Sequence, residues 1–156
     1  MNKKTINLFI SHCGEHEKYI EPFKELIGSK YNVRDSSIVE SEPNNATNEN
    51  YIKYSILAPK INWAGTVVVL IGPETQDRAY VNWEIEYAVK QGKRIVGVYL
   101  PGPFRYDIPE ALEKYGDALV GWDIDKINPA IGGSTRWEKS DGDLRPNSHI
   151  FRSNCS

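Results

Sequence analysis

The sequence predicts a doubly wound α/β fold around a parallel β-sheet, and three observations support this prediction. Strand and helix patterns alternate along the chain, which is typical of a parallel sheet with crossover helices. Thr66–Ile71 and Arg94–Leu100 are short apolar runs, the pattern of strands buried on both faces. The helical pattern of Arg78–Gln91 lies between them and stops at Gly92. These three segments predict a βαβ unit with a right-handed crossover.

The composition is that of an ordinary globular domain. The chain has 156 residues, which favours one domain, and 40% of them are hydrophobic and 26% charged. A formal net charge of -2 argues against nucleic acid as a partner, because phosphate binding usually needs a basic excess. The apolar runs are shorter than the roughly 18 residues of a membrane span, so we expect no membrane partner. Cys13 and Cys155 form no disulfide framework, which favours a cytoplasmic protein.

Four segments before the central unit have patterns of regular structure. They are the strand Ile6–Ser11, a helix beginning near Glu21, the short strand Tyr31–Val33 and the helix Asn50–Ala58. The first strand is apolar without alternation and should be central, and His12–Glu15 should follow it as a tight polar loop. Pro59 is expected to end the regular part of the fourth segment. The aperiodic stretch Arg34–Glu49 fits either a solvated connection or a mobile loop over a site.

After the central unit the sequence predicts two more helices and a last strand. They are the helix Pro109–Tyr115, the strand Ala118–Trp122 and the helix Asp123–Ile131. Asp123 is a good N-cap, because its carboxylate can accept a hydrogen bond from the first helical turn. Gly132-Gly133 marks a boundary. We therefore expect an α/β domain at residues 1–133 and a polar tail at residues 134–156 that packs on the domain or trails from it.

This order of elements predicts a five-stranded parallel sheet of flavodoxin type, in strand order 2-1-3-4-5, with helices on both faces. Such sheets bind ligands beyond the carboxyl ends of their strands, where the chain reverses its direction of winding. Here that point lies between the first and third strands. We expect the loops His12–Glu15 and Gly72–Tyr80 to converge there, beside the helix that carries Glu84.

Glu84 is the candidate functional residue of this helix. On a helical wheel it falls between an apolar stripe and an aromatic one, where a solvated carboxylate is not expected. The apolar stripe is Val81, Ile85 and Ala88, and the aromatic one is Tyr80, Trp83 and Tyr87. Glu86 looks like an ordinary surface acid. The alternative for Glu84 is a surface charge, or a salt-bridge partner of Lys90 or Arg94.

Several motifs resemble a known family. FISHCGE, at the end of the first strand, resembles a pattern of TIR domains. VVVLIGPET, followed by YVNWEIEYAVKQGKRIVGVYLPG, resembles the TIR-like, ThsB-like proteins of bacterial Thoeris anti-phage defence. The match covers most of Ile6–Gly102, and Asp35-Ser36 fits it as well.

This resemblance implies an enzyme that cleaves NAD⁺, with Glu84 as the catalytic residue. NAD⁺ would be a substrate rather than a cofactor. Nicotinamide would be released, and an ADP-ribose derivative, expected to be cyclic, would activate a separate effector protein. The residues that the resemblance assigns to substrate binding are Ser11, His12, Gly14, Asp35, Ser36 and Tyr80. Tyr80 stands where the enzymatic pattern often has Trp, which keeps the capacity for stacking.

The chemistry of this bond requires few groups. Nicotinamide leaves from a positively charged ring, so no general acid is needed, and one carboxylate can stabilise the charge that develops on the ribose. His12, Cys13 and His16 lack the spacing of a zinc site, so we expect no metal. Two other functions remain open: a non-catalytic interaction module that assembles as a homo-oligomer, and an enzyme similar to nucleoside deoxyribosyltransferases.

Overall fold

The computed structural model describes residues 6–36, 52–73, 79–102, 106–139 and 144. The sequence predicts either a solvated connection or a mobile loop over a site for Arg34–Glu49. Most of this stretch lies outside the described residues. Within the described part of the chain, no helix has the length and apolar character needed to cross a membrane.

Five parallel strands form one sheet in the order β2-β1-β3-β4-β5. The strands are β1 (Ile6–Ser11), β2 (Tyr31–Asp35), β3 (Thr66–Ile71), β4 (Arg94–Tyr99) and β5 (Ala118–Val120). This is the predicted order, and the flavodoxin-like fold class is confirmed. The register places Ile10 of β1 beside Asp35 of β2, and Ser11 beside Val69 of β3. The carboxyl ends of these three strands therefore meet at the predicted reversal of the winding.

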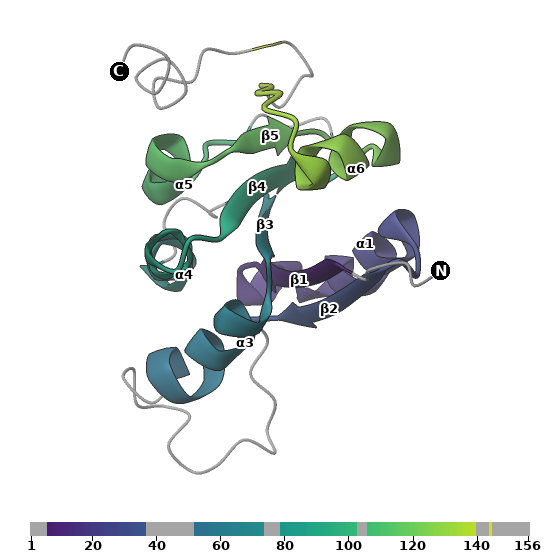
Figure 1. Ribbon diagram of the computed structural model, residues 1–156. Helices are drawn as coiled ribbons and strands as arrows, with labels where there is room; N and C mark the ends of the chain where they lie inside the picture. Colours follow the sequence, from purple (N-terminus) through teal and green to yellow (C-terminus); the bar gives the residue numbers. More distant parts are fainter. Residues whose placement is uncertain (1–5, 37–51, 74–78, 103–105, 140–143, 145–156) are drawn as a thin grey trace.

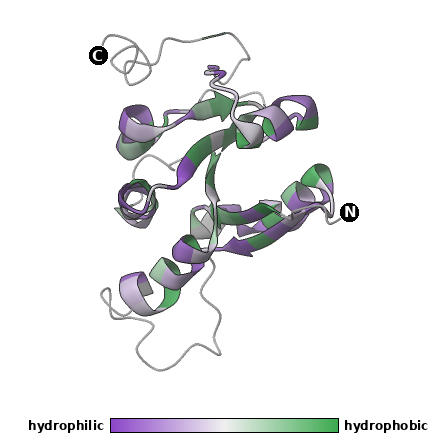
Figure 2. Cartoon of the chain, viewed as in Figure 1, coloured by the Kyte–Doolittle hydropathy of each residue, from purple (hydrophilic) through white to green (hydrophobic). Residues whose placement is uncertain are grey.

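Helices cover both faces of the sheet (Figure 1). They are η1 (a 3₁₀ helix, Gly14–Tyr19), α1 (Ile20–Ile27), η2 (a π-helix, Ile52–Leu57), α3 (Ala58–Trp63), α4 (Ala79–Lys90), α5 (Glu110–Tyr115) and α6 (Ile124–Gly132). One face packs against η2, α3, α4 and α5, and the other packs against α1 and α6. Figure 2 shows the strands mostly in the hydrophobic colour, whereas the helices carry both colours.

The alternation of side chains along β1 decides which residues face which layer. Leu8 and Ile10 belong to the core on the α1 and α6 side, and Phe9 belongs to the core on the α4 side. Ser11 follows Phe9 by two residues, so its side chain points to the α4 side as well. The last side chain of a buried strand is thus a hydroxyl directed at the helix that carries Glu84.

Two local predictions were wrong. Gly14 and Glu15 belong to η1 rather than to a loop, and Pro59 lies in the first turn of α3 instead of ending a helix. The π-helix η2 ends directly before this turn, so Pro59 lies where the helical hydrogen-bond pattern changes, and the chain remains helical from Ile52 to Trp63.

The edge strand β2 is longer than predicted. It continues past Val33 to Asp35, although Asn32 and Arg34 are exposed polar residues. The sequence pattern failed here because an edge strand has only one neighbour and its outer side chains can remain in water. The extension has a functional consequence, since it brings Asp35 to the carboxyl end of the sheet.

Residues that the sequence assigned to the tail pack closely on the domain. Trp137 and Glu138 are 3% and 0% exposed, and Trp137 bridges Leu119 in parallel orientation. The Glu138 carboxylate accepts from the Gly121 backbone N–H at 3.1 Å and is paired with Lys126 and Arg136. The Tyr99 hydroxyl donates to the Glu138 carbonyl at 3.0 Å. These contacts cover the β5 edge of the sheet; the predicted tail at 140–143 and 145–156 lies outside the described residues.

Trp137→Ala tests whether this segment stabilises the domain. Removing a buried indole should lower the free energy of unfolding by about 3 kcal/mol or more, measured by urea denaturation. Leu144→Ala is the control, because Leu144 is 65% exposed and its loss should change stability by less than about 0.5 kcal/mol. Equal stability of the two variants would contradict a structural role for Trp137.

Candidate functional site

Glu84 lies on the inner side of α4. The predicted apolar stripe of this helix is buried against the sheet: Val81, Ile85 and Ala88 are at most 1% exposed. Glu84 is itself only 1% exposed, whereas Glu86 is exposed as expected of an ordinary surface acid. The helix ends with Gly92 at a φ of 74°, which agrees with the predicted stop. Glu84 is therefore a buried carboxyl group, and the surface-charge interpretation is wrong.

One hydrogen bond holds the Glu84 carboxyl group. The Ser11 hydroxyl at the end of β1 donates to Glu84 Oε1 at 2.7 Å. The other oxygen, Oε2, is buried and has no hydrogen-bond partner among the described residues. Arg94, considered as a salt-bridge partner, instead donates to the backbone oxygens of Ala130 and Ser134. A buried carboxyl oxygen without a partner is costly, which is a reason to expect that it has a function.

A second group of predicted site residues adjoins Ser11. The Ser36 hydroxyl donates to the His12 carbonyl and accepts from the His12 N–H, both at 3.2 Å. His12 is 7% exposed; its Nδ1 lies 2.7 Å from the carbonyl oxygen of Cys13, and its Nε2 lies 3.8 Å from Asp35 Oδ1. Ser36 thus fastens the end of β2 to the end of β1.

The start of the segment after β3 meets η1 rather than the predicted loop His12–Glu15, and residues 74–78 of the predicted loop Gly72–Tyr80 lie outside the described residues. A Cβ on Gly72, which follows β3, would lie 3.0 Å from two atoms of the His16 imidazole and 2.7 Å from a methyl group of Leu100. His16 lies in η1 and is 4% exposed. The sequence singled out His16 only as a candidate metal ligand and missed this contact, because it requires the parallel pairing of β1 with β3.

Two predicted residues lie at the edge of this group. Gly14 begins η1, two residues after His12. Tyr80 lies one helical turn before Glu84 and is 37% exposed, and it makes no hydrogen bond or ring contact within the described part of the chain. The structure therefore brings together Ser11, His12, Asp35, Ser36 and Glu84, and it leaves Tyr80 on the surface.

Trp83 packs among other aromatic side chains. Its ring stacks on Tyr87 with centroids 5.2 Å apart and meets the edge of Tyr54 at 5.7 Å. The Lys53 ammonium lies over the same indole at 5.6 Å. These contacts make Trp83 a packing residue of the aromatic stripe.

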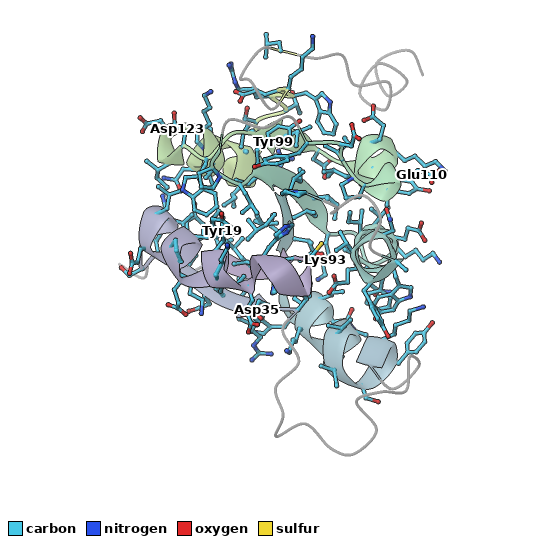
Figure 3. The ribbon with its side chains drawn as sticks, turned by 180° about the vertical axis from the view of Figure 1, so that it is seen from behind. Tyr19, Asp35, Lys93, Tyr99, Glu110 and Asp123 are labelled. Atoms are coloured by element: carbon cyan, nitrogen blue, oxygen red, sulfur yellow. The ribbon has the colours of Figure 1, made fainter. Side chains whose placement is uncertain are left out.

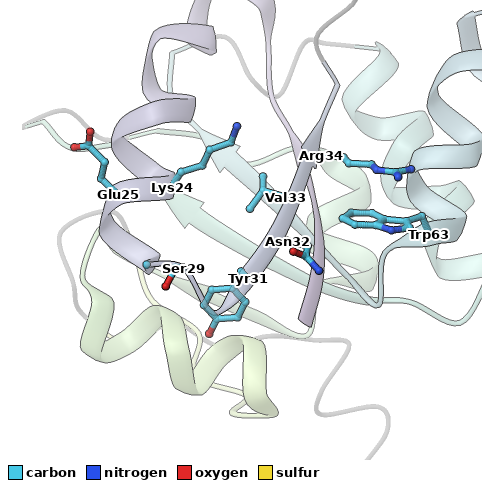
Figure 4. Close-up of a pocket in the computed structure, with 9 residues that line it drawn as sticks. Lys24, Glu25, Ser29, Tyr31, Asn32, Val33, Arg34 and Trp63 are labelled. Atoms are coloured by element: carbon cyan, nitrogen blue, oxygen red, sulfur yellow. The ribbon is translucent and has the colours of Figure 1, made fainter. Parts of the chain in front are cut away.

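A groove of about 630 Å³ lies beside the edge strand β2, away from Glu84 (Figure 4). Its lining includes Lys24, Tyr31, Arg34 and Trp63, and none of the predicted site residues. The Arg34 guanidinium stacks over the Trp63 ring at 4.2 Å. For metal ions, the described residues offer no group of three or more His, Cys, Asp or Glu ligands.

Comparison with known families identifies the family of this chain. Residues 9–103 match the model described as "Thoeris protein ThsB, TIR-like domain". The chain belongs to this family. The matched region includes the site residues that the structure brings together: Ser11, His12, Asp35, Ser36 and Glu84. It also includes the whole of α4. No curated protein sequence matches this TIR-like chain.

Two solved structures are similar to this TIR-like domain. A 2-deoxyribosyltransferase from the psychrotolerant bacterium Bacillus psychrosaccharolyticus has a TM-score of 0.54 and 16% identity, over 78% of this chain and 89% of that one. A conserved protein from Enterococcus faecalis V583 has a TM-score of 0.49 and 10% identity, over 96% of both chains. At such low identity the transferase supports the fold alone.

The surroundings of Glu84 in the TIR-like domain oppose its ionisation. Burial raises the pKa of Glu84 from an ordinary value of 4.5 to about 8, and the negative charge of Asp35 raises it as well. The Ser11 hydrogen bond and the Lys60 ammonium both lower it, but they do not offset the burial. At neutral pH the protonated form therefore predominates in the folded domain.

Glu84→Gln tests this ionisation through stability. Between pH 4.5 and about 8 the unfolded chain has lost the Glu84 proton and the folded domain retains it, so the wild type loses stability as the pH rises. The maximal loss is roughly 1.4 kcal/mol per pH unit. The free energy of unfolding of Glu84→Gln relative to wild type should therefore rise across this range and level off above it. A difference that does not change with pH, in denaturant titrations, would contradict the raised pKa.

Proposed function

We propose that this TIR-like domain cleaves NAD⁺ between nicotinamide and ribose, with Glu84 as the catalytic residue. The observation that carries the proposal is the Glu84 carboxyl group, which is buried at the carboxyl end of the sheet. Ser11 donates to one of its oxygens, and the other has no hydrogen-bond partner among the residues that the structure describes. Membership of the Thoeris ThsB TIR-like family supports an anti-phage context. The raised pKa supports a functional role, because perturbed carboxyl groups concentrate at active sites.

The proposed reaction begins with cleavage of the bond between the ribose carbon and the pyridinium nitrogen. The electron pair of this bond returns to the ring, which leaves as neutral nicotinamide, and positive charge develops on the sugar. An ionised Glu84 stabilises that charge, and its buried setting makes the electrostatic term stronger than in water. A nucleophile then adds to the sugar carbon and releases a proton if it is a neutral O–H or N–H group.

Ser11 orients the carboxylate in this scheme. Its hydroxyl donates to Oε1, which leaves Oε2 to approach the ribose. Bound NAD⁺ carries its positive charge on the nicotinamide ring, and that charge favours the ionised form of Glu84. His12, Asp35 and Ser36 adjoin Ser11 and form the side of the site where the nucleotide would lie.

The acceptor for the sugar carbon determines the product. Water gives ADP-ribose, and a nitrogen or hydroxyl of the same molecule gives a cyclic derivative. In the Thoeris context we propose the cyclic product, which would act as a diffusible signal to a separate effector protein.

Purified protein with NAD⁺ provides the direct test. Wild type should release nicotinamide, detected by liquid chromatography, and Glu84→Gln should reduce the rate by at least about a hundredfold, because the stabilising charge is lost. Glu86→Gln is the matched control: it removes an exposed carboxylate from the same helix and should leave the rate unchanged.

Three outcomes would count against this proposal. Release that persists in Glu84→Gln would exclude Glu84 as the catalytic group. Absence of turnover, together with concentration-dependent self-association in light scattering, would favour a non-catalytic interaction module. Exchange of free bases on deoxynucleosides, measured in parallel, would instead favour transferase chemistry.

The pH dependence tests the state of Glu84 in the reaction. Because the ionised form is the active one, kcat/KM should rise with an apparent pKa near 8, falling about tenfold per pH unit below it. The corresponding pKa in the kcat profile should be lower, because the substrate's positive charge is then close to Glu84. A profile that is flat from pH 5 to 9 would contradict this mechanism.

A further inference from the structure

Lys60 lies on α3 beside the carboxyl end of β2. Its Nζ donates to the backbone oxygen of Asp35 at 3.1 Å, and the Lys60 side chain is half-buried. Ala58 and Ile61 anchor α3 in the core on the α4 side of the sheet. Figure 3 shows Asp35 close to this helix. The ammonium group is therefore held on the same face of the sheet as Glu84.

The contact at Asp35 places the Lys60 charge next to the group of site residues. Asp35 faces His12 at 3.8 Å, and Ser36 fastens His12 to the end of β2. His12 directly follows Ser11, the residue that holds Glu84. Asp35, which accepts the Lys60 hydrogen bond, is thus close to His12, and His12 is next in sequence to Ser11, the hydrogen-bond partner of Glu84.

The elements on the α4 side of the sheet and at the carboxyl ends of β1 and β2 carry several charged and titratable groups. They are His12 before η1, His16 in η1, Asp35 in β2, Lys53 in η2, Lys60 in α3, and Glu110, Glu113 and Lys114 in α5. Among the described residues, Lys60 and Asp35 are the two whose charges change the pKa of Glu84: Lys60 lowers it and Asp35 raises it. Lys60 thus opposes both the burial of Glu84 and the nearby acid.

We propose that Lys60 is a positioning residue that stabilises the ionised form of Glu84 through its positive charge. This inference rests on the proposed function and adds a residue that none of the motifs assigns. The physical reason is that an ionised carboxylate in a buried site needs a compensating charge, and water screens an interaction with a buried group less than one between two surface groups. Lys60 would act through Glu84 and would not need to contact the reacting bond.

Three substitutions separate the charge of Lys60 from its hydrogen bond. Lys60→Gln removes the charge and keeps a donor for the Asp35 oxygen, Lys60→Met removes both, and Lys60→Arg keeps both. Lys93→Met is the matched control, because Lys93 also donates to a backbone oxygen, that of Asn62 at 3.1 Å, but this hydrogen bond is exposed and Lys93 precedes β4. Lys93 is not one of the described groups that shift the pKa of Glu84.

The measurement is the pKa of Glu84 itself, from NMR titration of protein labelled with ¹³C at the glutamate carboxyl carbons and assigned with Glu84→Gln. Lys60→Gln and Lys60→Met should raise this pKa by about half a unit or more, while Lys60→Arg and Lys93→Met leave it unchanged. Asp35→Asn should lower it, which checks that the titration reports nearby charges. An unchanged pKa in Lys60→Gln, or in Lys60→Met if only that variant folds, would overturn the proposal.

The kinetic arm separates this inference from the proposed function. In the nicotinamide assay, kcat/KM of Lys60→Gln should show the same upward shift of its apparent pKa, and Lys60→Arg should restore the wild-type profile. A shifted NMR pKa without turnover in any variant would support Lys60 and overturn NAD⁺ cleavage. Turnover that depends on Glu84, together with an unchanged pKa of Glu84 in Lys60→Gln, would support NAD⁺ cleavage and overturn the role of Lys60.

Discussion

The hydrogen bond from Ser11 to Glu84 is the interaction on which the arrangement of the site depends. It joins the end of a buried strand to the middle of a helix, 73 residues apart in the sequence. Few polar side chains can be buried between a strand and a helix, because each needs a hydrogen-bond partner there. The backbone groups of both elements already bond within the sheet and within the helix, so the partner has to be another side chain. Within the described part of the chain, the Glu84 carboxyl group has one hydrogen-bond partner, Ser11, and one oxygen without a partner. The fold therefore places a buried carboxyl group with a raised pKa where a parallel sheet is open to ligands.

The surrounding contacts keep this junction in place. Ser36 fastens β2 to β1 through both backbone groups of His12, and the His16 ring fills the space above Gly72 after β3. Both contacts involve segments that follow strands, so they depend on the register of the sheet. The opposite edge of the sheet is stabilised separately, where Trp137 and Glu138 cover β5. The site and this cover lie at different ends of the strand order, so a change at one need not disturb the other.

Much of the fold could be predicted from local patterns. The bounds of β1 and β3 and the N-cap at Asp123 are as predicted, because buried apolar runs and a capping carboxylate are local signals. Pro59 and β2 were misjudged for different reasons. Proline can either end or begin a helix, and that choice depends on the π-turn before it; an edge strand lacks the apolar pattern of a central one. Lys60 gave no sequence signal, since a lysine on a short helix is usually a surface charge.

The sequence by itself determined the α/β class, the strand order and the unusual position of Glu84 between two stripes of α4. These follow from periodicity, which records the side of each element that is removed from water. Only the tertiary structure decided that Ser11 is the partner of Glu84, that its other carboxyl oxygen has no partner among the described residues, and that the charges of Lys60 and Asp35 act on Glu84 in opposite directions. Those facts depend on the register between β1, β2 and β3 and on the packing of α3 and α4 over them. Distances between segments remote in sequence are set by that packing, and periodicity contains no record of them.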